Sequence, residues 1–366
     1  WTPPRPARGP AWGDPRPGMS NLELRHGITQ PIVSYPMVEN AFRAARGLSL
    51  EAHRRELADY CARSAAVAAP NPYAWFRDAK SADTIATVTA DNRMVGFPYP
   101  KFMNSILDVN QGAAILLCAE PAARRLGIPS DRWVWPWAGV DVTEHWFLQD
   151  RVDYHTLPGV RRAGAALLET VGVGVDGIAH LDLYSCFPIA PRLSAAMLGL
   201  APDTSRPLTV TGGLPWFGGP GSNYTTHAVA SVISRLRADR ASLGLTHALG
   251  WNLTKHALAV YGGTPPPHGW RRVGGAALQE RVDAEPHPPV VEQAAGPGTI
   301  EAYTVVHGRD GAPERGSVIG RLGDGRRFVA VLPRDRALLE AMERTEQVGR
   351  PGVVRAEGER NVFDPA

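Results

Sequence analysis

The most informative stretch of the chain lies at residues 212–224 and reads GGLPWFGGPGSNY. Its glycines let the backbone turn sharply and approach a bound ligand closely. A helix is predicted to begin at Tyr224, and the free N–H groups of its first turn favour an anion or a developing oxyanion. Ser222 or Asn223 is expected to cap this helix. The candidate substrate-binding residues of the stretch are Gly213, Gly218, Gly219, Ser222 and Asn223.

The sequence on either side of this stretch alternates between short apolar runs and helix-like segments. The predicted strands are residues 133–140, 178–185, 208–211, 244–249 and 256–261. The predicted helices are residues 159–171, 190–200 and 224–238. Such alternation is typical of an α/β protein with a mostly parallel sheet that helices cover on both faces. In these sheets the functional groups collect at the carboxyl ends of the strands.

A second candidate segment, LDLYSCFP at residues 181–188, lies at the end of a predicted strand. Cys186 is a candidate nucleophile if a base or a helix dipole lowers its pKa, and a buried structural thiol is the alternative. Tyr184 is a candidate hydrogen-bond donor or general acid, and a strand tyrosine packed on the neighbouring helix is the alternative. Tyr224, at the start of the next helix, is the third candidate catalytic residue.

A third candidate segment, LGWNLTKH at residues 249–256, forms the turn between the last two predicted strands. Asn252 is a polar residue in this apolar setting and a candidate substrate-binding group. A tight turn with solvated side chains is the alternative interpretation. His227 lies one turn into the helix that starts at Tyr224, and it is expected to be structural or exposed.

Composition divides the chain into five segments. Residues 1–18 are rich in proline and arginine and are predicted to form an extended arm. A first region spans residues 19–130, the alternating pattern occupies residues 131–262, and a proline-rich linker follows at residues 263–295. Residues 296–366 contain short strands joined by Asp-Gly turns, which predicts a small all-β barrel of the OB type.

Two segments of the first region carry clear local patterns. Residues 50–67 have the spacing of a helix with Ser49 as its N-cap. Residues 108–120 are predicted to form a turn followed by a buried strand. Cys61 lies in the helix and Cys118 in the predicted strand, and both are expected to be small buried hydrophobes.

Composition also excludes several classes of protein. The 366 residues are 44 % hydrophobic with a formal net charge of +3, and no run of about 18 apolar residues predicts a membrane span. The three cysteines are widely spaced and form no CxxC, so neither a metal site nor a disulfide framework is predicted, and a reducing, cytoplasmic location is expected. Arginines and acidic residues are nearly balanced in the C-terminal segment, so no nucleic-acid partner is expected.

The order of these elements and loops resembles the C-terminal half of the thiolase fold. The similarity is strongest to the sterol-carrier-protein-linked thiolases and to bacterial thiolase-like proteins. Upstream segments resemble those that such proteins carry between their two halves: NPYAWFRD at residues 71–78, NRMV at 92–95 and residues 108–114. Residues 296–366 resemble the extra OB-type domain of one thiolase-like type. The resemblance covers residues 20–366 and implies a thiolase-like fold followed by a small barrel.

The resemblance also implies a chemistry. Thiolases bind acyl-CoA, acylate a cysteine of their N-terminal half, and use a second cysteine with histidine and asparagine groups for proton transfer and oxyanion binding. Tyr184 stands where the family has the histidine or asparagine of the second loop, and Gly219 stands where it has a catalytic histidine. The second cysteine is absent around residues 250–252. Acyl-CoA is thus the implied partner and a coenzyme A thioester the implied substrate, with no covalently bound cofactor.

A further implication is that part of the fold is missing. The first β-α-β units of the N-terminal half, with the acylated cysteine, do not occur in this sequence. We expect either that the chain is part of a longer protein, or that a partner chain supplies the missing half, or that the chain forms a homo-oligomer. Residues 20–130 are then expected to expose apolar surface.

Three functional interpretations stay open. The first is a thiolase-like protein that binds or acts on acyl-CoA thioesters, an acetyl-CoA acetyltransferase-like acyltransferase of lipid or sterol metabolism with degenerate catalytic loops. The second is a retro-aldolase of the thiolase superfamily that cleaves the β-hydroxyacyl-CoA of sterol side chains. The third is a non-catalytic module that binds coenzyme A or serves assembly.

Overall fold

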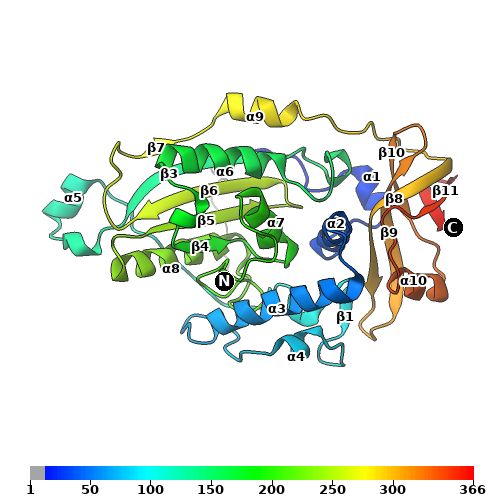
Figure 1. The fold of residues 1–366 in the computed structure, drawn as a ribbon, viewed down its shortest axis with the longest axis horizontal. Helices are drawn as coiled ribbons and strands as arrows, with labels where there is room; N and C mark the ends of the chain where they lie inside the picture. The colour runs from blue at the N-terminus through cyan, green and yellow to red at the C-terminus, as the bar shows by residue number, and fades with distance from the viewer. Residues whose placement is uncertain (1–12) are drawn as a thin grey trace, which may run out of the picture.

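A five-stranded mixed sheet forms the centre of the larger part of the molecule (Figure 1). The computed structural model describes residues 13–366, so most of the predicted arm lies outside the described residues. The strand order of the sheet is β4-β5-β6-β3-β7. The strands are β3 (Trp135–Thr143), β4 (His180–Leu183), β5 (Leu243–Gly250), β6 (Lys255–Gly262) and β7 (Arg271–Arg272).

Strand direction in this sheet follows from its connections. β4 pairs with β5 and β7 pairs with β3 in parallel, whereas β6 is antiparallel to both β5 and β3. Four strands therefore point the same way, and β6 is reversed because a tight turn joins it to β5. The sheet is mostly parallel, as expected, in the sense that four of its five strands run in the same direction. Because the reversed strand β6 lies between two of them, two of the four pairings are antiparallel.

The strand predicted at residues 208–211 does not form. Leu208 O accepts a hydrogen bond from Leu183 N at 2.9 Å. The next residues leave the sheet, because Thr209 and Thr211 turn toward the buried carboxylate of Asp182. The prediction used only the hydrophobic pattern, and that pattern does not show that Thr209 and Thr211 bond to a buried carboxylate.

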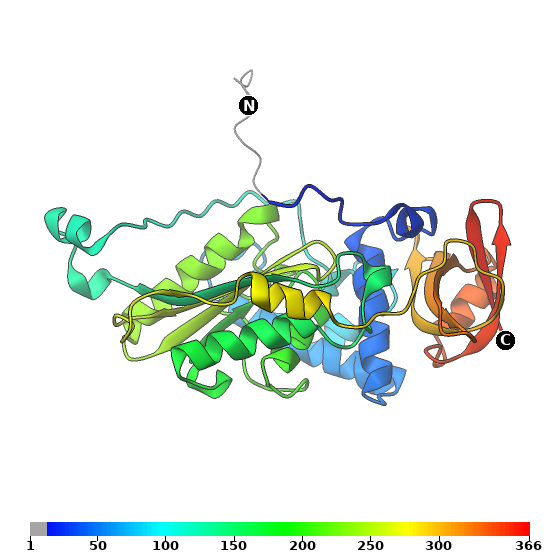
Figure 2. The same ribbon diagram turned by 90° about the horizontal axis from the view of Figure 1, so that it is seen from above.

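Helices cover both faces of the sheet, as predicted. α6 (Pro158–Val171) and α8 (Tyr224–Ala238) lie on opposite faces (Figure 2), and α7 (Ile189–Met197) packs on β4 and α6. α6 begins with a proline, whose fixed φ suits the first helical position. It ends at Gly172, which has a φ of 80° and so lets the chain leave the helix in the left-handed conformation.

The first four α-helices of the described chain lie well before the sheet in sequence. They are α1 (Asn21–Arg25), α2 (Pro31–Ala45), α3 (Leu50–Ala68) and α4 (Ala82–Ala86). α3 begins after Ser49, whose side chain accepts a hydrogen bond from Ala52 N, as predicted. α2 is the most buried of them and lies between the sheet and the C-terminal barrel (Figure 1).

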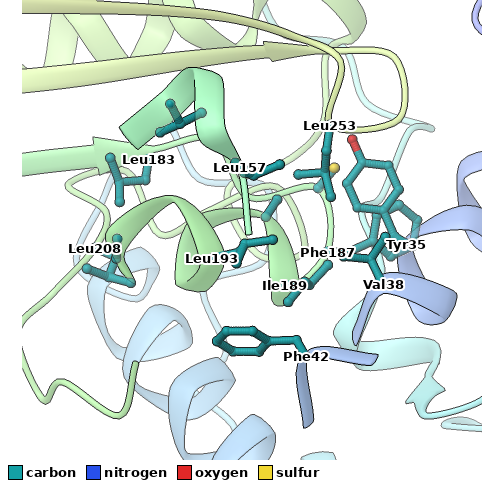
Figure 3. Packing of buried hydrophobic residues seen from close by; sticks show 14 of the residues in the cluster. Tyr35, Val38, Phe42, Leu157, Leu183, Phe187, Ile189, Leu193, Leu208 and Leu253 are labelled. Carbon is teal, nitrogen blue, oxygen red and sulfur yellow. The ribbon is translucent and has the colours of Figure 1, made fainter. Parts of the chain in front are cut away.

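The main hydrophobic core forms where α2 meets the start of α7. Figure 3 shows Tyr35, Val38 and Phe42 of α2 directed toward Phe187 and Ile189. The Tyr35 and Phe187 rings stack with their centroids 4.7 Å apart. This packing fixes α2 against the loop that follows β4, so the N-terminal helices help to position that loop.

A closed barrel forms the C-terminal part of the chain. Its elements are β8 (Gly296–His307), β9 (Pro313–Leu322), β10 (Arg327–Val331), α10 (Arg336–Met342), β11 (Pro351–Glu357) and β12 (Arg360–Pro365). The order β8-β9-β10-β12-β11 closes because β11 also pairs with β8, and β10 runs parallel to β12. A five-stranded Greek-key barrel is the OB architecture, so the predicted fold class is confirmed.

The barrel is tied to the body by short elements and by side chains. β1 (Met94–Gly96) and β2 (Tyr99–Pro100) form a hairpin, and β1 pairs with β8. Arg43 of α2 makes a two-pronged ion pair with Glu346 beyond α10. Asn40 of α2 donates hydrogen bonds to Phe97 O and Tyr303 O. The body and the barrel therefore share a packed junction.

The predicted linker at residues 263–295 is partly ordered structure. β7 and α9 (Ala276–Asp283) lie within it, and α9 packs against α6 and β3. Val282 is only 1 % exposed, because its side chain reaches the core. The proline content of the segment did not predict that Val282 would be buried.

The strand predicted at residues 108–120 is wrong. This segment forms neither helix nor strand before α5 (Glu120–Arg125), and Figure 2 shows it running along the outside of the body past α8. Leu116 and Leu117 are 80 % and 79 % exposed, and Cys118 is exposed instead of buried. An apolar run becomes a strand only beside another strand that pairs with it, and none lies there among residues 13–366.

Most of the exposed large hydrophobic side chains lie in residues 20–130, as expected. The exposed large hydrophobic side chains between residues 20 and 130 are Leu24, Tyr73, Trp75, Phe76, Val88, Leu107, Ile115, Leu116, Leu117 and Leu126.

Single-turn helices complete the described chain: η1 (Lys101–Met103), η2 (Ser130–Arg132), η3 (Leu148–Asp150), η4 (Val175–Gly177) and η5 (Gly221–Asn223). Among residues 13–366, no helix combines the length and the apolar character needed to cross a membrane.

Candidate functional site

The candidate residues Tyr184 and Cys186 follow β4, at the carboxyl end of the sheet. Because β4 and β5 are parallel neighbours, this loop lies beside the end of β5, and Tyr184 N donates to His247 O at 3.2 Å. The Tyr184 side chain is half-buried, and its hydroxyl has no hydrogen-bond partner among residues 13–366. It is therefore free to donate a hydrogen bond to a ligand.

Cys186 has an environment that suppresses its reactivity. The side chain is 8 % exposed, and burial raises the pKa of the thiol to about 12 although the nearby Tyr35 hydroxyl lowers it. Since the thiolate is the nucleophilic form, almost none of it is present at neutral pH. The geometry thus favours the structural interpretation of this cysteine over the nucleophilic one.

Tyr224 lies directly beneath Tyr184. The two rings meet edge to face with their centroids 5.5 Å apart. Tyr224 is completely buried, its hydroxyl donates to Asp182 Oδ1 at 3.0 Å, and it lies 2.7 Å from Thr211 Oγ1. Burial raises the pKa of Tyr224 well above its usual value. Tyr224 is therefore placed to support Tyr184 and not to contact a substrate itself.

Asp182 is a residue of this site that the sequence analysis did not single out. Its carboxylate is fully buried in β4 and accepts hydrogen bonds from Thr209 Oγ1 at 2.8 Å and from the N–H groups of Val210 and Thr211. Burial raises its pKa, while these hydrogen bonds oppose the rise. An acidic residue between two apolar strand residues was the available signal. Asp182 holds the start of the glycine-rich stretch in place.

The glycine-rich stretch is covered by other parts of the chain. A side chain at Gly218 would meet Gln111, and one at Gly219 would meet Ser105 and Ile106 O. Gly219 N also donates to Ile106 O at 2.8 Å. These glycines are required because residues 105–111 cross the stretch closely. The close approach that the sequence assigned to a ligand is here made by the protein backbone.

Gly213 makes a similar internal contact. A side chain there would come within 2.8 Å of Ser185 Oγ, and the residue has a φ of 77°. Residues 73–76 cover the same stretch from another side, since Trp75 N donates to Phe217 O and Phe76 N donates to Trp216 O. The three glycines predicted to bind substrate thus serve to pack loops together in the described chain.

The N-terminus of α8 is more open. Ser222 is exposed and Asn223 is half-buried, and neither side chain caps the helix, contrary to the expectation. Asn223 Nδ2 instead lies 3.4 Å from Nε2 of His227, whose pKa is lowered by burial. The first-turn N–H groups of α8 therefore carry no side-chain cap, and an anionic group can use them.

Asn252 is committed to structure. Its Oδ1 accepts from Ser34 Oγ at 2.7 Å, and its Nδ2 donates to Gly18 O at 3.3 Å. Only 2 % of the residue is exposed. These bonds tie the turn after β5 to α2 and to the segment before α1, so both side-chain polar atoms of the buried Asn252 are engaged within the protein.

The turn after β5 is held in an unusual backbone conformation. Trp251 and Leu253 both have positive φ values, 55° and 57°, although neither is glycine. The guanidinium of Arg151 donates to the carbonyl groups of Asn252 and Leu253, and Tyr35 donates to Trp251 O at 2.7 Å. Strained conformations of this kind persist only when the surroundings fix them, and they cluster at functional sites. Trp251 is 46 % exposed, which makes its ring available to a ligand.

No group of three or more histidine, cysteine, aspartate or glutamate side chains in residues 13–366 is arranged to hold a metal ion. The imidazoles of His247 in β5 and His256 in β6 are both buried. Their nitrogens lie 2.9 Å apart, and burial lowers the pKa of His247 to about 3. This pair is neutral and buried, so it contributes to the sheet and not to catalysis.

The fold and the loops at the carboxyl end of the sheet define a thiolase-like protein with an added barrel. The family model described as the thiolase-like protein type 1 additional C-terminal domain matches residues 277–359. The crystal structure of a monomeric SCP2-thiolase like protein type 1 from Mycobacterium smegmatis is similar, with a TM-score of 0.88 and 37 % identity over 96 % of this chain and 76 % of that one. A search of curated proteins found no match. The chain belongs to the SCP2-thiolase-like protein type 1 family.

Proposed function

We propose that this protein binds acyl-CoA thioesters at the carboxyl ends of β4 and β5 without cysteine-dependent acyl transfer. The observation that carries the proposal is the state of Cys186, whose buried thiol has a pKa raised to about 12. Gly219 supports it, because this position has no room for an imidazole beneath Ser105 and Ile106. The loops after β4 and β5 therefore offer neither a reactive thiolate at Cys186 nor an imidazole at Gly219, whereas Tyr184 and the N-terminus of α8 keep donors for a thioester.

Three features would hold the thioester. The uncapped N-terminus of α8 offers N–H groups to a phosphate or to the thioester oxygen, next to Ser222 and Asn223. The free hydroxyl of Tyr184 adds a hydrogen-bond donor. The exposed ring of Trp251 offers an apolar surface to the pantetheine chain or the acyl group.

Calorimetric titration with coenzyme A and acetyl-CoA tests the proposal, together with an assay for thiolysis of acetoacetyl-CoA. We expect saturable binding and no turnover. Tyr184→Phe is expected to weaken acetyl-CoA binding about tenfold, the usual scale for one lost hydrogen bond at a binding site. Tyr73→Phe is the matched control, because Tyr73 is 76 % exposed and lies outside the loop after β4. Absent binding, or robust thiolysis, would contradict the proposal.

Retro-aldol cleavage of a β-hydroxyacyl-CoA is the second candidate function. It requires a base that removes the hydroxyl proton and donors that stabilise the enolate released as the carbon–carbon bond breaks. The Tyr184 hydroxyl is a suitable donor, and His227 has a burial-lowered pKa that leaves it neutral at pH 7 and able to accept a proton. Release of a ketone from a β-hydroxyacyl-CoA, lost in Tyr184→Phe and retained in Tyr73→Phe, would support this candidate.

We further propose that the exposed apolar strip formed by Leu107, Ile115, Leu116 and Leu117 is covered by the other half of a thiolase fold. The relative from M. smegmatis is monomeric, which favours this arrangement over a homo-oligomer. Analytical ultracentrifugation distinguishes coverage by the other half of the fold from a homo-oligomer. A monomer whose apolar strip binds an apolar dye supports the proposal. A stable homodimer that Leu116→Asp dissociates would contradict it.

A further inference from the structure

A cavity of about 460 Å³ lies where α5, the start of β3 and the C-terminal end of α8 come together. Figures 1 and 2 both place α5 at the end of the molecule farthest from the barrel. Arg237 lines the cavity and follows Tyr224 by 13 positions in α8, which is about 20 Å along a helix. The cavity is therefore distinct from the candidate site at the N-terminus of α8, and its volume suits a small molecule.

Three tryptophans line this cavity. Trp133 and Trp135 pack edge to face with their ring centroids 5.8 Å apart. Trp133 Nε1 donates to Ile128 O at 3.1 Å, which fixes the orientation of the ring. Trp270 comes from the loop between β6 and β7 and is 55 % exposed. Indole rings that are held in place and open to solvent offer faces and edges against which another aromatic ring can stack.

Two arginines line the same cavity without a carboxylate partner in residues 13–366. Arg237 Nε donates to Arg132 O at 2.9 Å, which leaves both terminal nitrogens of Arg237 open, and the Arg132 guanidinium makes no hydrogen bond within the described chain. Both residues are exposed, so a ligand can reach them.

The two guanidiniums also lie close enough to repel each other. Partial burial and the charge of Arg132 both lower the pKa of Arg237, and no carboxylate of the described residues opposes them. An anion placed beside two neighbouring cations relieves this repulsion. Arg132 and Arg237 thus form a place where negative charge is favoured.

The carboxylate on the wall does not neutralise these arginines. Glu120 lines the cavity, but its Oε1 accepts from Nε and Nη2 of Arg124, at 2.9 and 2.6 Å. The Arg124 guanidinium in turn lies 5.0 Å from the centre of the Trp133 ring. Arg132 and Arg237 therefore leave an excess of positive charge on a wall that also carries aromatic rings.

We propose that this cavity binds a planar aromatic molecule that carries a carboxylate or phosphate group. The ring stacks on the three tryptophans, and the anion lies against the two arginines, whose planar guanidiniums suit both kinds of group. Leu116 and Leu117 of the exposed strip also line the cavity, but the side chains that select the ligand belong to other segments. Acyl-CoA binding at the other end of α8 is not required for this site.

Four probes test the full chain by ligand-observed NMR and calorimetry. Indole-3-acetate, indole and tryptamine share one ring and differ in charge, and 1-naphthyl phosphate carries a phosphate in place of the carboxylate. We expect one or both anions to bind at least about tenfold more tightly than indole and tryptamine, with an affinity that falls as salt is added. The tighter anion identifies the preferred group. Equal binding of indole or tryptamine, or no binding of any probe, would overturn the proposal.

Cys118 reports where the anion binds, because this exposed thiol lines the cavity. N-ethylmaleimide is a neutral reagent that does not compete for the arginines. A saturating concentration of the tighter anion is expected to slow the reaction of Cys118 with this reagent several-fold. Binding that leaves the reaction rate unchanged would place the anion elsewhere and overturn the proposal.

Two exposed arginines of the same helix provide a matched pair of variants. Arg237→Gln is expected to weaken binding of the tighter anion about tenfold and to leave indole binding unchanged. Arg235→Gln is the control, because Arg235 is exposed in the same turn of α8 and does not line the cavity. Equal affinities in the two variants would overturn the assignment of the anion to Arg237.

A second pair of variants tests the aromatic wall. Trp270→Ala is expected to weaken the binding of every probe, whereas Trp75→Ala, at a residue that is 47 % exposed and does not line the cavity, should leave it unchanged. Full binding in Trp270→Ala would show that the ring does not stack there and would contradict the proposal.

Discussion

The ring of Tyr184 rests edge to face on the ring of Tyr224, with the centroids 5.5 Å apart. The two tyrosines differ sharply in what their hydroxyls do. The Tyr224 hydroxyl is bound to Asp182 and Thr211 in the core, whereas the hydroxyl of the half-buried Tyr184 has no hydrogen-bond partner among residues 13–366. One tyrosine therefore supports the loop after β4, and the other is available to a ligand.

Tyr224→Phe is expected to lower the free energy of unfolding by about 1–3 kcal/mol, the usual result when a buried charged acceptor loses a donor. Asp182 keeps its bonds from Thr209 and two N–H groups, so the protein should still fold. Urea denaturation measures the change. Tyr184→Phe is the control, with an expected loss below about 0.5 kcal/mol because its hydroxyl has no partner. Equal losses in the two variants would contradict this division of roles.

Gly219→His is expected not to restore thiolase activity, and to destabilise the protein. A side chain at this position meets Ser105 and Ile106 O, and backbone atoms cannot move aside without shifting residues 105–111. Overpacking of this kind costs about 1–3 kcal/mol. Gly139→Ala is the matched control, since its side chain would come no closer than 3.7 Å to Leu258 O.

The assay for Gly219→His combines thermal unfolding with thiolysis of acetoacetyl-CoA. A stable variant with measurable thiolysis would show that residues 105–111 move away from the glycine-rich stretch more easily than this packing indicates. Gly139→Ala should change the unfolding temperature little.

The three cysteines are expected to differ in their reaction with a thiol reagent. Burial raises the pKa values of Cys61 and Cys186 to about 12, whereas Cys118 is exposed. The native protein should therefore show one fast-reacting thiol at pH 8, and the other two should react only after unfolding. Cys118→Ser should remove the fast phase, and Cys61→Ser should not. A fast phase that persists in Cys118→Ser would mean that Cys186 is reactive.

The histidine pair predicts a dependence of stability on pH. His247 Nε2 lies 2.9 Å from His256 Nδ1, and His256 Nε2 lies 3.1 Å from Leu253 O, an arrangement in which the Nδ1 of His256 must be unprotonated. Burial lowers the pKa of His247 to about 3 in the folded chain, below its ordinary value of 6.5. The unfolded chain then binds a proton first as the pH falls, so stability is present above pH 6.5 and is lost below it. At pH 5 His247 alone should account for a loss of about 2 kcal/mol, and His256, whose pKa burial also lowers well below its ordinary value, adds to it.

Urea denaturation between pH 7 and pH 5 measures this slope. The double variant His247→Leu and His256→Leu should make it shallower, because two of the buried histidines that take up protons on unfolding are gone. His268→Leu is the control, since His268 is exposed and should leave the slope unchanged. An unchanged slope in the double variant would show that other groups cause the loss.

The regular elements of the sheet and barrel could be predicted because their patterns are local. α6 and α8 have helical spacing with clear ends, and the Asp-Gly turns of the barrel lie at Gly311 and Gly325, which have φ values of 81° and 88°. Ser49 caps α3 by accepting a hydrogen bond from Ala52 N, only three residues along the chain. Signals of this kind are contained in a few consecutive residues.

The expected and the observed surroundings of the candidate residues differ because of contacts between residues that are distant in sequence. Asn252 was predicted to bind substrate, but Ser34 and Gly18, more than 200 positions away in sequence, use its side chain. The glycines at 218 and 219 were assigned to a ligand, and residues 105–111 occupy that space. Spacing within a motif carries no information about which segment will cover it.

The sequence by itself determined the thiolase-like order of elements and the added barrel. Only the tertiary structure decided which candidate groups are free, since accessibility depends on segments that meet in space. It left Tyr184 and the N-terminus of α8 open, while it buried Cys186, Tyr224 and Asn252. It also left Leu116 and Leu117 exposed, because an apolar run is buried only where another part of the fold packs against it.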